Sequence, residues 1–206
     1  MNAEKKTYPV NIRGELTVPP GPGWWLLKWL LGIPHYFILI FLWIAFAVVW
    51  IITLFAILFT KKHPKGLFDF KVGVLRWTWR VGFYSYDALG TDKYPPFSFD
   101  PDPDYPADLE IAYPEKLSQG LVLVKWWLLA IPHYIVVGFF HGGWGRGNVG
   151  LVTILAIFGA VVRLFSDRYP EDIFKLVVGM NRWFFRTWAY ASLMTDEYPP
   201  FRLWDD

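Results

Sequence analysis

The chain has 206 residues, of which 54% are hydrophobic and 20% aromatic, with 13 tryptophans among them. Such an aromatic excess, combined with long uncharged runs, is typical of membrane proteins. The formal net charge is only +2 and no basic nucleic-acid-binding motif is found, so nucleic acid is not an expected partner. The sequence has no cysteine, which excludes disulfides, iron–sulfur clusters and thiol nucleophiles.

The first predicted elements lead into the longest apolar run of the chain. Apolar residues at mainly alternate positions predict a half-buried strand within 8–18. After a Pro-Gly break, residues 24–60 are almost continuously apolar, which is longer than one membrane span requires. Pro34 divides this run, since proline is favoured in a first helical turn. We therefore expect a tryptophan-rich interfacial helix over 24–33 and a transmembrane helix over about 34–59.

A helix of a different kind is predicted over 67–89. Four of its charged residues are spaced by seven, four and seven positions and therefore share one face: Asp69, Arg76, Arg80 and Asp87. Apolar side chains occupy the rest of this amphipathic helix. The segment that follows it, at 91–99, predicts a turn and then an extended strand.

The second half of the chain repeats this plan after an Asp-Pro-rich linker. A second apolar segment covers 119–140, and a further apolar helix is expected over 149–165. Between them, the glycine-rich stretch 141–148 has no counterpart in the first half, and we expect it to interrupt what was a single helix. A second amphipathic helix is predicted over 173–194, with one stripe formed by Lys175, Arg182 and Arg186.

Three motifs recur in the same order in both halves. They are Ile-Pro-His-Tyr, a pair of arginines four positions apart with aromatic residues between them, and Thr-Asp-x-Tyr-Pro-Pro-Phe. Their order indicates an internal duplication, with repeat one at 1–100 and repeat two at 101–206.

The predicted fold class is a mainly α integral membrane protein built from two tandem parallel repeats. It would have about four transmembrane helices plus interfacial helices, with four short extra-membrane β-strands forming one small sheet. The turns at 61–65 and 163–168 are both basic, which favours the same side of the membrane for both and hence two spans per repeat. An alternative places both amphipathic helices flat in the membrane interface. The distribution of Lys and Arg does not set the orientation.

The best candidates for a binding site are the four duplicated arginines, Arg76, Arg80, Arg182 and Arg186. An ionised arginine in hydrocarbon is costly, so such residues mark pathways, lipid headgroup sites or internal partners. Their guanidinium groups suit anionic lipid or phosphate. The other interpretation is structural: the arginines pair with carboxylates and hold the helices together, the candidate partners being Asp69, Asp87, Asp92 and Asp196.

His35 and His133 occupy identical motifs, which makes them candidate ligands of haem, a pigment or a metal. No second ligand stands at a suitable spacing beside either one, so the sequence predicts neither a metal site nor a cofactor, and a structural polar contact is the alternative. The unmatched glycine-rich stretch is the expected place for a partner-specific contact, with His141, Trp144 and Arg146 as candidate contact residues.

The chain resembles a family of bacterial membrane proteins of unknown function. The resemblance rests on Ile-Pro-His-Tyr, a basic turn ending in Pro, Phe-x-x-x-Val-Gly-Val-x-Arg-Trp-x-x-Arg, and Thr-Asp-x-Tyr-Pro-Pro-Phe, and it covers nearly the whole chain. Two places depart from the pattern: the stretch 141–148, and Gly179-Met180-Asn181, which stands where repeat one has Gly73-Val74-Leu75. The resemblance supports the predicted fold and implies no established activity.

From these observations we expect a non-enzymatic integral membrane protein, an accessory or scaffold subunit of a larger membrane complex, since no catalytic constellation is recognisable. One alternative is a lipid- or small-anion-binding or transport protein that uses the arginine stripes. A second alternative is a haem- or pigment-binding subunit that uses His35 and His133. The expected location is the bacterial inner membrane, as a multi-pass protein. The expected partners are membrane lipids together with other subunits or a second copy of the chain.

Overall fold

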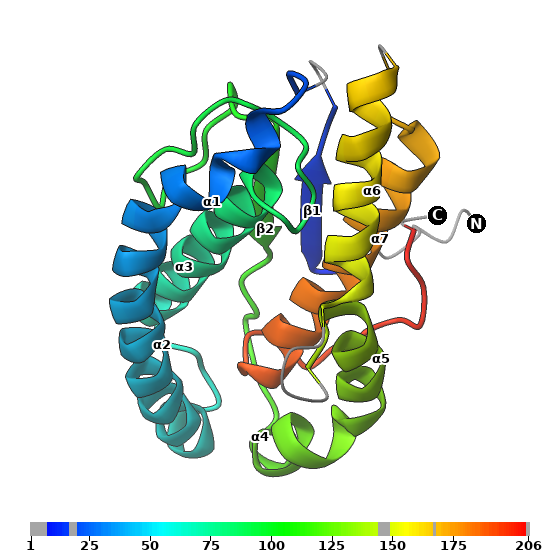
Figure 1. Ribbon diagram of the computed structural model, residues 1–206. Coiled ribbons are helices and arrows are strands. Elements are labelled where there is room, and N and C mark those ends of the chain that lie inside the picture. Colours follow the sequence, from blue (N-terminus) through cyan, green and yellow to red (C-terminus); the bar gives the residue numbers. More distant parts are fainter. Residues whose placement is uncertain (1–7, 17–19, 144–148, 167, 205–206) are drawn as a thin grey trace, which may run out of the picture.

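The computed structural model describes residues 8–16, 20–143, 149–166 and 168–204, and it is mainly helical with one small antiparallel sheet (Figure 1). Repeat one contains β1 (Val10–Gly14), the 3₁₀ turn η1 (Trp24–Leu26), α1 (Lys28–Leu31), α2 (Ile33–Thr60) and α3 (Lys65–Tyr84). Repeat two contains β2 (Ala107–Ile111), α4 (Gln119–Val124), the π-helical turn η2 (Lys125–Leu129), α5 (Ile131–His141), α6 (Leu151–Phe165) and α7 (Glu171–Ala191). The predicted mainly helical class and small sheet are confirmed.

Helix α2 is the longest element and lies at one edge of the molecule (Figure 1). Its 28 residues extend about 42 Å, with Pro34 in the first turn and Lys61 ending the helix in a left-handed conformation (φ 61°). Among the described residues, α2 is the one helix that is by itself long and apolar enough to cross a bilayer. The bent pair Gln119–Leu129 and Ile131–His141, with 44° between its halves, would be a second. The four predicted transmembrane helices are thus reduced to one or two candidates.

The two amphipathic helices form the interior of the protein. Helix α3 buries most of its residues, including Trp79 and Phe83, and α7 buries Phe174 and Phe185 in the same hydrophobic core. The sequence predicted that α3 and α7 either span the membrane or lie flat in its interface, with their apolar faces in contact with lipid. In the structure, these apolar faces pack against the sheet and the other helices.

The sheet relates the two repeats by an approximate two-fold axis. The Tyr-Pro pairs that precede the strands, at 8–9 and 105–106, make Ile12 the equivalent of Leu109. In the antiparallel ladder Ile12 faces Leu109 directly, so equivalent residues of the two repeats meet at the centre of the sheet. A rotation of 180° about an axis through this point reverses the direction of each element that runs across the axis, as the two strands do.

Consequently α2 and the α5–α6 pair run in opposite directions (Figure 1). The contacts agree: the Leu117 N–H donates to the Lys61 carbonyl, just after α2, at 2.9 Å, while Leu89 packs against Ala156 and Ala160 of α6 at the other end. The prediction of parallel repeats with both basic turns on one side is therefore wrong. A duplicated sequence is the same for parallel and for inverted repeats, and only the strand pairing distinguishes them.

The glycine-rich stretch does interrupt the second apolar helix. Helix α5 ends at His141, Gly142 follows in a left-handed conformation (φ 76°) that favours glycine, and α6 begins only at Leu151. The equivalent helix α2 continues without a break. Two of the predicted contact residues, Trp144 and Arg146, lie outside the described residues.

The Pro-Pro segments that follow α3 and α7 do not join the sheet, which contradicts the predicted sheet of four extended segments. Within the described ranges, β1 and β2 are the sheet's two strands. Proline has no N–H to donate to a ladder, which disfavours pairing at Pro95 and Pro96. The aromatic residues on either side of these prolines, Tyr94 and Phe97, pack against the ring of His35 instead.

Candidate functional site

The arginines of repeat one lie beneath the sheet and pair with a carboxylate of β2. Arg76 Nε donates to Asp108 Oδ1 at 2.8 Å, and Arg80 Nη2 lies 3.3 Å from the same oxygen. Both arginine side chains are buried. Asp69, one of the predicted partners, pairs with Lys65 on the exposed side of α3 at 2.5 Å. The ion pairs of Arg76 and Arg80 are therefore structural, and they use a carboxylate that was not among the predicted partners.

The arginines of repeat two contact the equivalent region on the other side of the two-fold axis. Arg182 donates to the carbonyl of Leu203 at 2.8 Å and to that of Ile12 at 3.5 Å. The Arg186 guanidinium lies over the ring of Tyr8, 5.4 Å from its centroid. All four arginines thus make contacts that join the sheet, the helices and the terminal segments.

A second duplicated ion pair uses lysines, which the sequence interpretation missed. Lys28 Nζ lies 2.9 Å from Asp92 Oδ1, and Lys125 Nζ lies 2.7 Å from Asp196 Oδ1. Both lysines are buried. Lys28 also donates to the carbonyl of Thr91 at 2.7 Å, and Lys125 donates to the carbonyl of Thr195 at 2.8 Å. Lys125 is separated from its Ile-Pro-His-Tyr motif by one residue more than Lys28 is, and the π-helical turn η2 accommodates this extra residue. In the sequence, the feature that could have revealed this ion pair is a lysine a few residues before each Ile-Pro-His-Tyr motif.

The two histidines of the repeated motifs have the same structural partners. Trp77 Nε1 donates to His35 Nδ1 at 2.9 Å, and Trp183 Nε1 donates to His133 Nδ1 at 2.9 Å. Because an indole N–H can only donate, Nδ1 accepts and the neutral ring has its proton on Nε2. A metal or haem ligand needs a nitrogen lone pair, and in this tautomer Nε2 has none to offer while Nδ1 is occupied. The geometry therefore disfavours the cofactor-ligand hypothesis and favours the structural contact.

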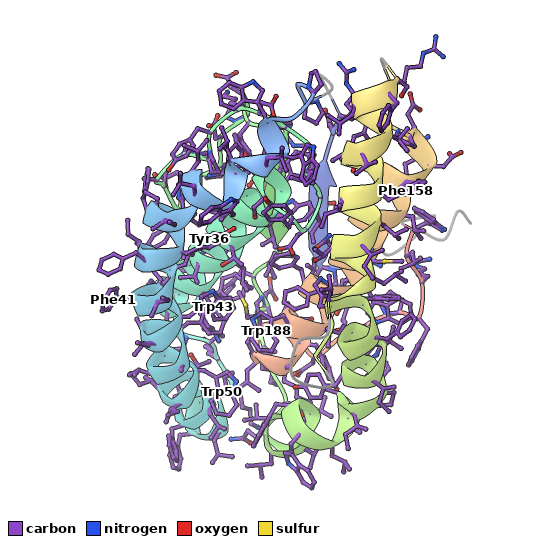
Figure 2. All side chains as sticks on the ribbon, viewed as in Figure 1. Tyr36, Phe41, Trp43, Trp50, Phe158 and Trp188 are labelled. Carbon is purple, nitrogen blue, oxygen red and sulfur yellow. The ribbon has the colours of Figure 1, made fainter. Side chains whose placement is uncertain are left out.

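An apolar groove opens between α2 on one side and α5 and α7 on the other. It has a volume of about 360 Å³ and almost entirely apolar walls. Figure 2 shows Trp43 and Trp50 of α2 and Trp188 of α7 directed into this space, whereas Phe41 points away from the protein. The ring of Trp43 meets that of Trp188 at 5.6 Å between centroids, and Trp50 meets Trp126 at 5.2 Å. Aromatic residues of both repeats therefore form the walls of the apolar groove.

A second hollow of about 560 Å³ adjoins the apolar groove, since Trp43 lines both. Its lining includes the rings of Tyr36 and Tyr86 and the side chain of Asp87, and we call it the polar end of the groove. Burial raises the pKa of the Asp87 carboxyl above its ordinary value, and nearby His141 partly opposes this shift. The polar end therefore combines aromatic surface with one acidic group.

Residues from three separate elements meet beside this hollow. Asn181 Nδ2 of α7 donates to the Asp87 carbonyl at 2.8 Å, and His141 Nε2 of α5 lies 3.5 Å from Asn181 Oδ1. A hydrogen bond here needs His141 to donate from Nε2, because Oδ1 can only accept. Within the described part of the chain, no hydrogen-bond donor contacts the Asp87 carboxylate. Because Asp87 lines the hollow, a ligand bound there would lie beside its side chain.

The cluster lies where the two repeats differ. Asn181 stands at the position of Leu75, and His141 begins the stretch that has no counterpart in repeat one. The two departures from the repeated pattern are far apart in the sequence, and both contribute side chains beside Asp87. The sequence predicted Asp87 as an ion-pair residue and His141 as a partner contact, and it showed Asn181 only as part of a departure from the repeated pattern. The sequence feature that could have revealed this cluster is that Asn181 and His141 both lie where the two repeats differ.

Comparison with known proteins agrees with the duplicated architecture. A family model described as a domain of unknown function, DUF4389, matches residues 24–98 and again 122–202. No curated protein and no solved structure matches the chain. Since the two matched regions together cover more than half of the sequence, the chain belongs to this family of domains of unknown function.

Proposed function

We propose that the protein is a non-enzymatic integral membrane protein whose apolar groove binds the hydrocarbon chain of an amphiphilic lipid. The observation that supports this most directly is the aromatic lining of a groove that opens between helices with exposed apolar sides. Pockets of this size with mostly apolar walls and few polar groups are typical of small-molecule sites.

The outward sides of the long apolar helices support membrane insertion. Large apolar side chains remain exposed along α2 from Phe37 to Phe59, and along α5 and α6, and Figure 2 shows Phe41 and Phe158 pointing outward on opposite sides. Water-soluble proteins rarely expose such continuous apolar surface, and only 17% of the most apolar part of α2 is buried. We propose a multi-pass protein of the cell membrane, in which α2 crosses in one direction and the segment containing α5 and α6 returns.

The polar side chains of the repeated motifs support a binding role rather than an enzymatic one. The lysine–aspartate pairs, the arginine contacts beneath the sheet and the tryptophan–histidine pairs all connect elements of the fold to one another. An amphiphile that entered between α2 and α5 would meet the tryptophan rings first, and apolar contact with these rings would supply most of its binding free energy.

Filling the apolar groove tests this proposal. Ala47 lines the groove, while Val48, the next residue of α2, is exposed on the outward side. We expect Ala47→Trp to lower the amount of lipid that remains bound in a maltoside detergent about tenfold, which corresponds to roughly 1.4 kcal/mol. Val48→Trp is the matched control and should retain the lipid. Native mass spectrometry counts the bound molecules, and equal retention by the wild type and Ala47→Trp would contradict the proposal.

The accessory or scaffold role is the second candidate function, and the length of α2 favours it. The helix extends about 42 Å, beyond the roughly 30 Å of a bilayer core, and its outward side is apolar throughout. A partner helix packed along this side would cover it. A stoichiometric partner that stays bound after mild detergent extraction, and is lost in Val48→Trp, would support this role. A homogeneous monomer under several gentle conditions would contradict it.

A further inference from the structure

The polar end of the groove contains a carboxylate, which could bind the headgroup of an amphiphile but is not needed to bind its acyl chain. The Asp87 carboxylate borders this hollow, and no donor among the described residues forms a hydrogen bond with it. Its burial is costly for the ionised form, so a ligand that brings a positive charge would be favoured there. The neighbouring titratable group, His141, is engaged with Asn181 through Nε2.

The rings around Asp87 favour the same kind of ligand. Tyr36, Trp43 and Tyr86 line the hollow, and the negative faces of aromatic rings attract organic cations. The Tyr86 hydroxyl donates to the Trp25 carbonyl at 2.7 Å, which holds this ring in place. The Trp43 ring packs against Phe46 at 4.8 Å and is likewise held. The aromatic surface is therefore largely formed before a ligand arrives.

The position of Asp87 depends on a glycine of α3. A Cβ atom on Gly82 would overlap the Asp87 carboxylate, so glycine at this position allows the carboxylate to lie against the helix. The Asp87 N–H also donates to the Gly82 carbonyl at 3.1 Å, which fixes the backbone of the turn. The polar end of the groove can therefore be altered in two independent ways: a substitution of Asp87 removes the negative charge, and a substitution of Gly82 displaces it.

We infer that the groove selects amphiphiles with a cationic ammonium headgroup, which Asp87 and the surrounding aromatic rings bind at the polar end while the chain occupies the apolar part. This inference rests on the proposed function and specifies its ligand class. The charge of the headgroup is complementary to Asp87, and its methyl or methylene groups suit the rings of Tyr36, Trp43 and Tyr86. Anionic amphiphiles would be disfavoured, because their headgroups would face a carboxylate.

Two matched amphiphiles test the inference on the intact protein in maltoside micelles. Dodecyltrimethylammonium has a permanent positive charge, and dodecyldimethylamine oxide has the same chain with no net charge at neutral pH. We expect the wild type to bind the ammonium compound about tenfold more tightly, as a desolvated cation–aromatic and ion-pair contact would provide. Native mass spectrometry or calorimetry measures both affinities, and their ratio is the readout.

The variants assign the preference to Asp87. Asp87→Asn should lower the affinity ratio to near one, and Gly82→Ala should lower it by displacing the carboxylate while keeping its charge. Asp69→Asn is the matched control, because it removes an exposed carboxylate of α3 that pairs with Lys65 at the surface, and it should leave the ratio as in the wild type. Should Asp87→Asn not fold, the wild-type ratio and Gly82→Ala still decide the question.

The outcomes separate the two proposals. If the wild type binds both amphiphiles equally well, the headgroup inference is overturned and chain binding in the groove stands. If it binds neither, the proposed function fails and the inference falls with it. A preference for the ammonium compound that persists in both Asp87→Asn and Gly82→Ala would show that the charge is recognised elsewhere, which also overturns the inference.

Discussion

The indole Nε1 of Trp77 donates a 2.9 Å hydrogen bond to Nδ1 of His35, and this bond joins α3 to the start of α2. The same bond joins Trp183 to His133 in repeat two, so the duplication preserves it. Each histidine also stacks on the phenylalanine of the following motif, with 4.0 Å between the ring centroids of His35 and Phe97. The repeated motifs therefore converge on one structural unit, a histidine held by a tryptophan and an aromatic stack.

Trp77→Phe should destabilise the protein by about 1–3 kcal/mol, because it leaves His35 Nδ1 buried without its donor. Trp29→Phe is the matched control, since Trp29 is exposed and should tolerate the change within about 0.5 kcal/mol. Chemical unfolding in detergent, followed by tryptophan fluorescence, measures both. Equal stability of the two variants would contradict the structural role of the Trp77–His35 bond.

Asp108→Asn should cost about 3–5 kcal/mol, because one carboxylate oxygen serves both Arg76 and Arg80 in a buried site. The loss would leave two guanidinium groups close together without a counter-charge. Asp104→Asn, in the exposed linker, should change the free energy of unfolding by less than about 0.5 kcal/mol. The same unfolding experiment compares them, and a loss below 1 kcal/mol for Asp108→Asn would refute this assignment.

The stability of the protein should rise with pH above neutrality because of Lys71. Burial, with Lys125 nearby, lowers the pKa of Lys71 to about 7. In the unfolded chain a lysine keeps a pKa near 10.4, so between these values the unfolded state binds more protons and the free energy of unfolding increases with pH. Lys71→Met should reduce this increase between pH 7 and pH 9. The exposed Lys175→Met should not, and identical pH profiles for Lys71→Met and the wild type would disprove the assignment.

The inverted arrangement of the repeats predicts which turns share a side of the membrane. Positions 62 and 116 lie at the end of the molecule where Lys61 bonds Leu117, and positions 93 and 168 lie at the opposite end. The chain has no cysteine, so single cysteines can be placed without background labelling. An impermeant maleimide should label Lys62→Cys and Lys116→Cys from one side, and Lys93→Cys and Arg168→Cys from the other. Labelling of Lys62→Cys and Arg168→Cys from the same side would contradict the proposed crossing.

Much of the local structure could be predicted from the sequence because its causes are local. The long apolar run with Pro34 near its start predicts α2 to within a residue at each end, and the periodic charges predict the helices now seen as α3 and α7. The glycine-rich stretch after His141 was correctly interpreted as a break, since glycine favours the left-handed conformation found at Gly142. The extended segments at 94–99 were misinterpreted, because their prolines and aromatic residues pack on a histidine rather than pairing as strands.

The candidate site was less predictable, because it depends on contacts between distant segments. Asp108 was overlooked as the partner of Arg76 since the strand that presents it is separated from α3 by the linker between the repeats. Likewise, nothing local connects Asp87 to Asn181, which is 94 positions farther along the chain. Both pairs exist only because the two repeats fold against each other.

The sequence by itself determined the duplication, the mainly helical class and the apolar helix α2, because each follows from residue order and periodicity within one segment. The tertiary structure alone decided that the repeats are inverted, that the arginines lie beneath the sheet and that Asp87 faces an aromatic hollow. The physical reason is the pairing of Ile12 with Leu109: two equivalent strands can align in parallel or antiparallel, and the side-chain packing of both repeats together selects one.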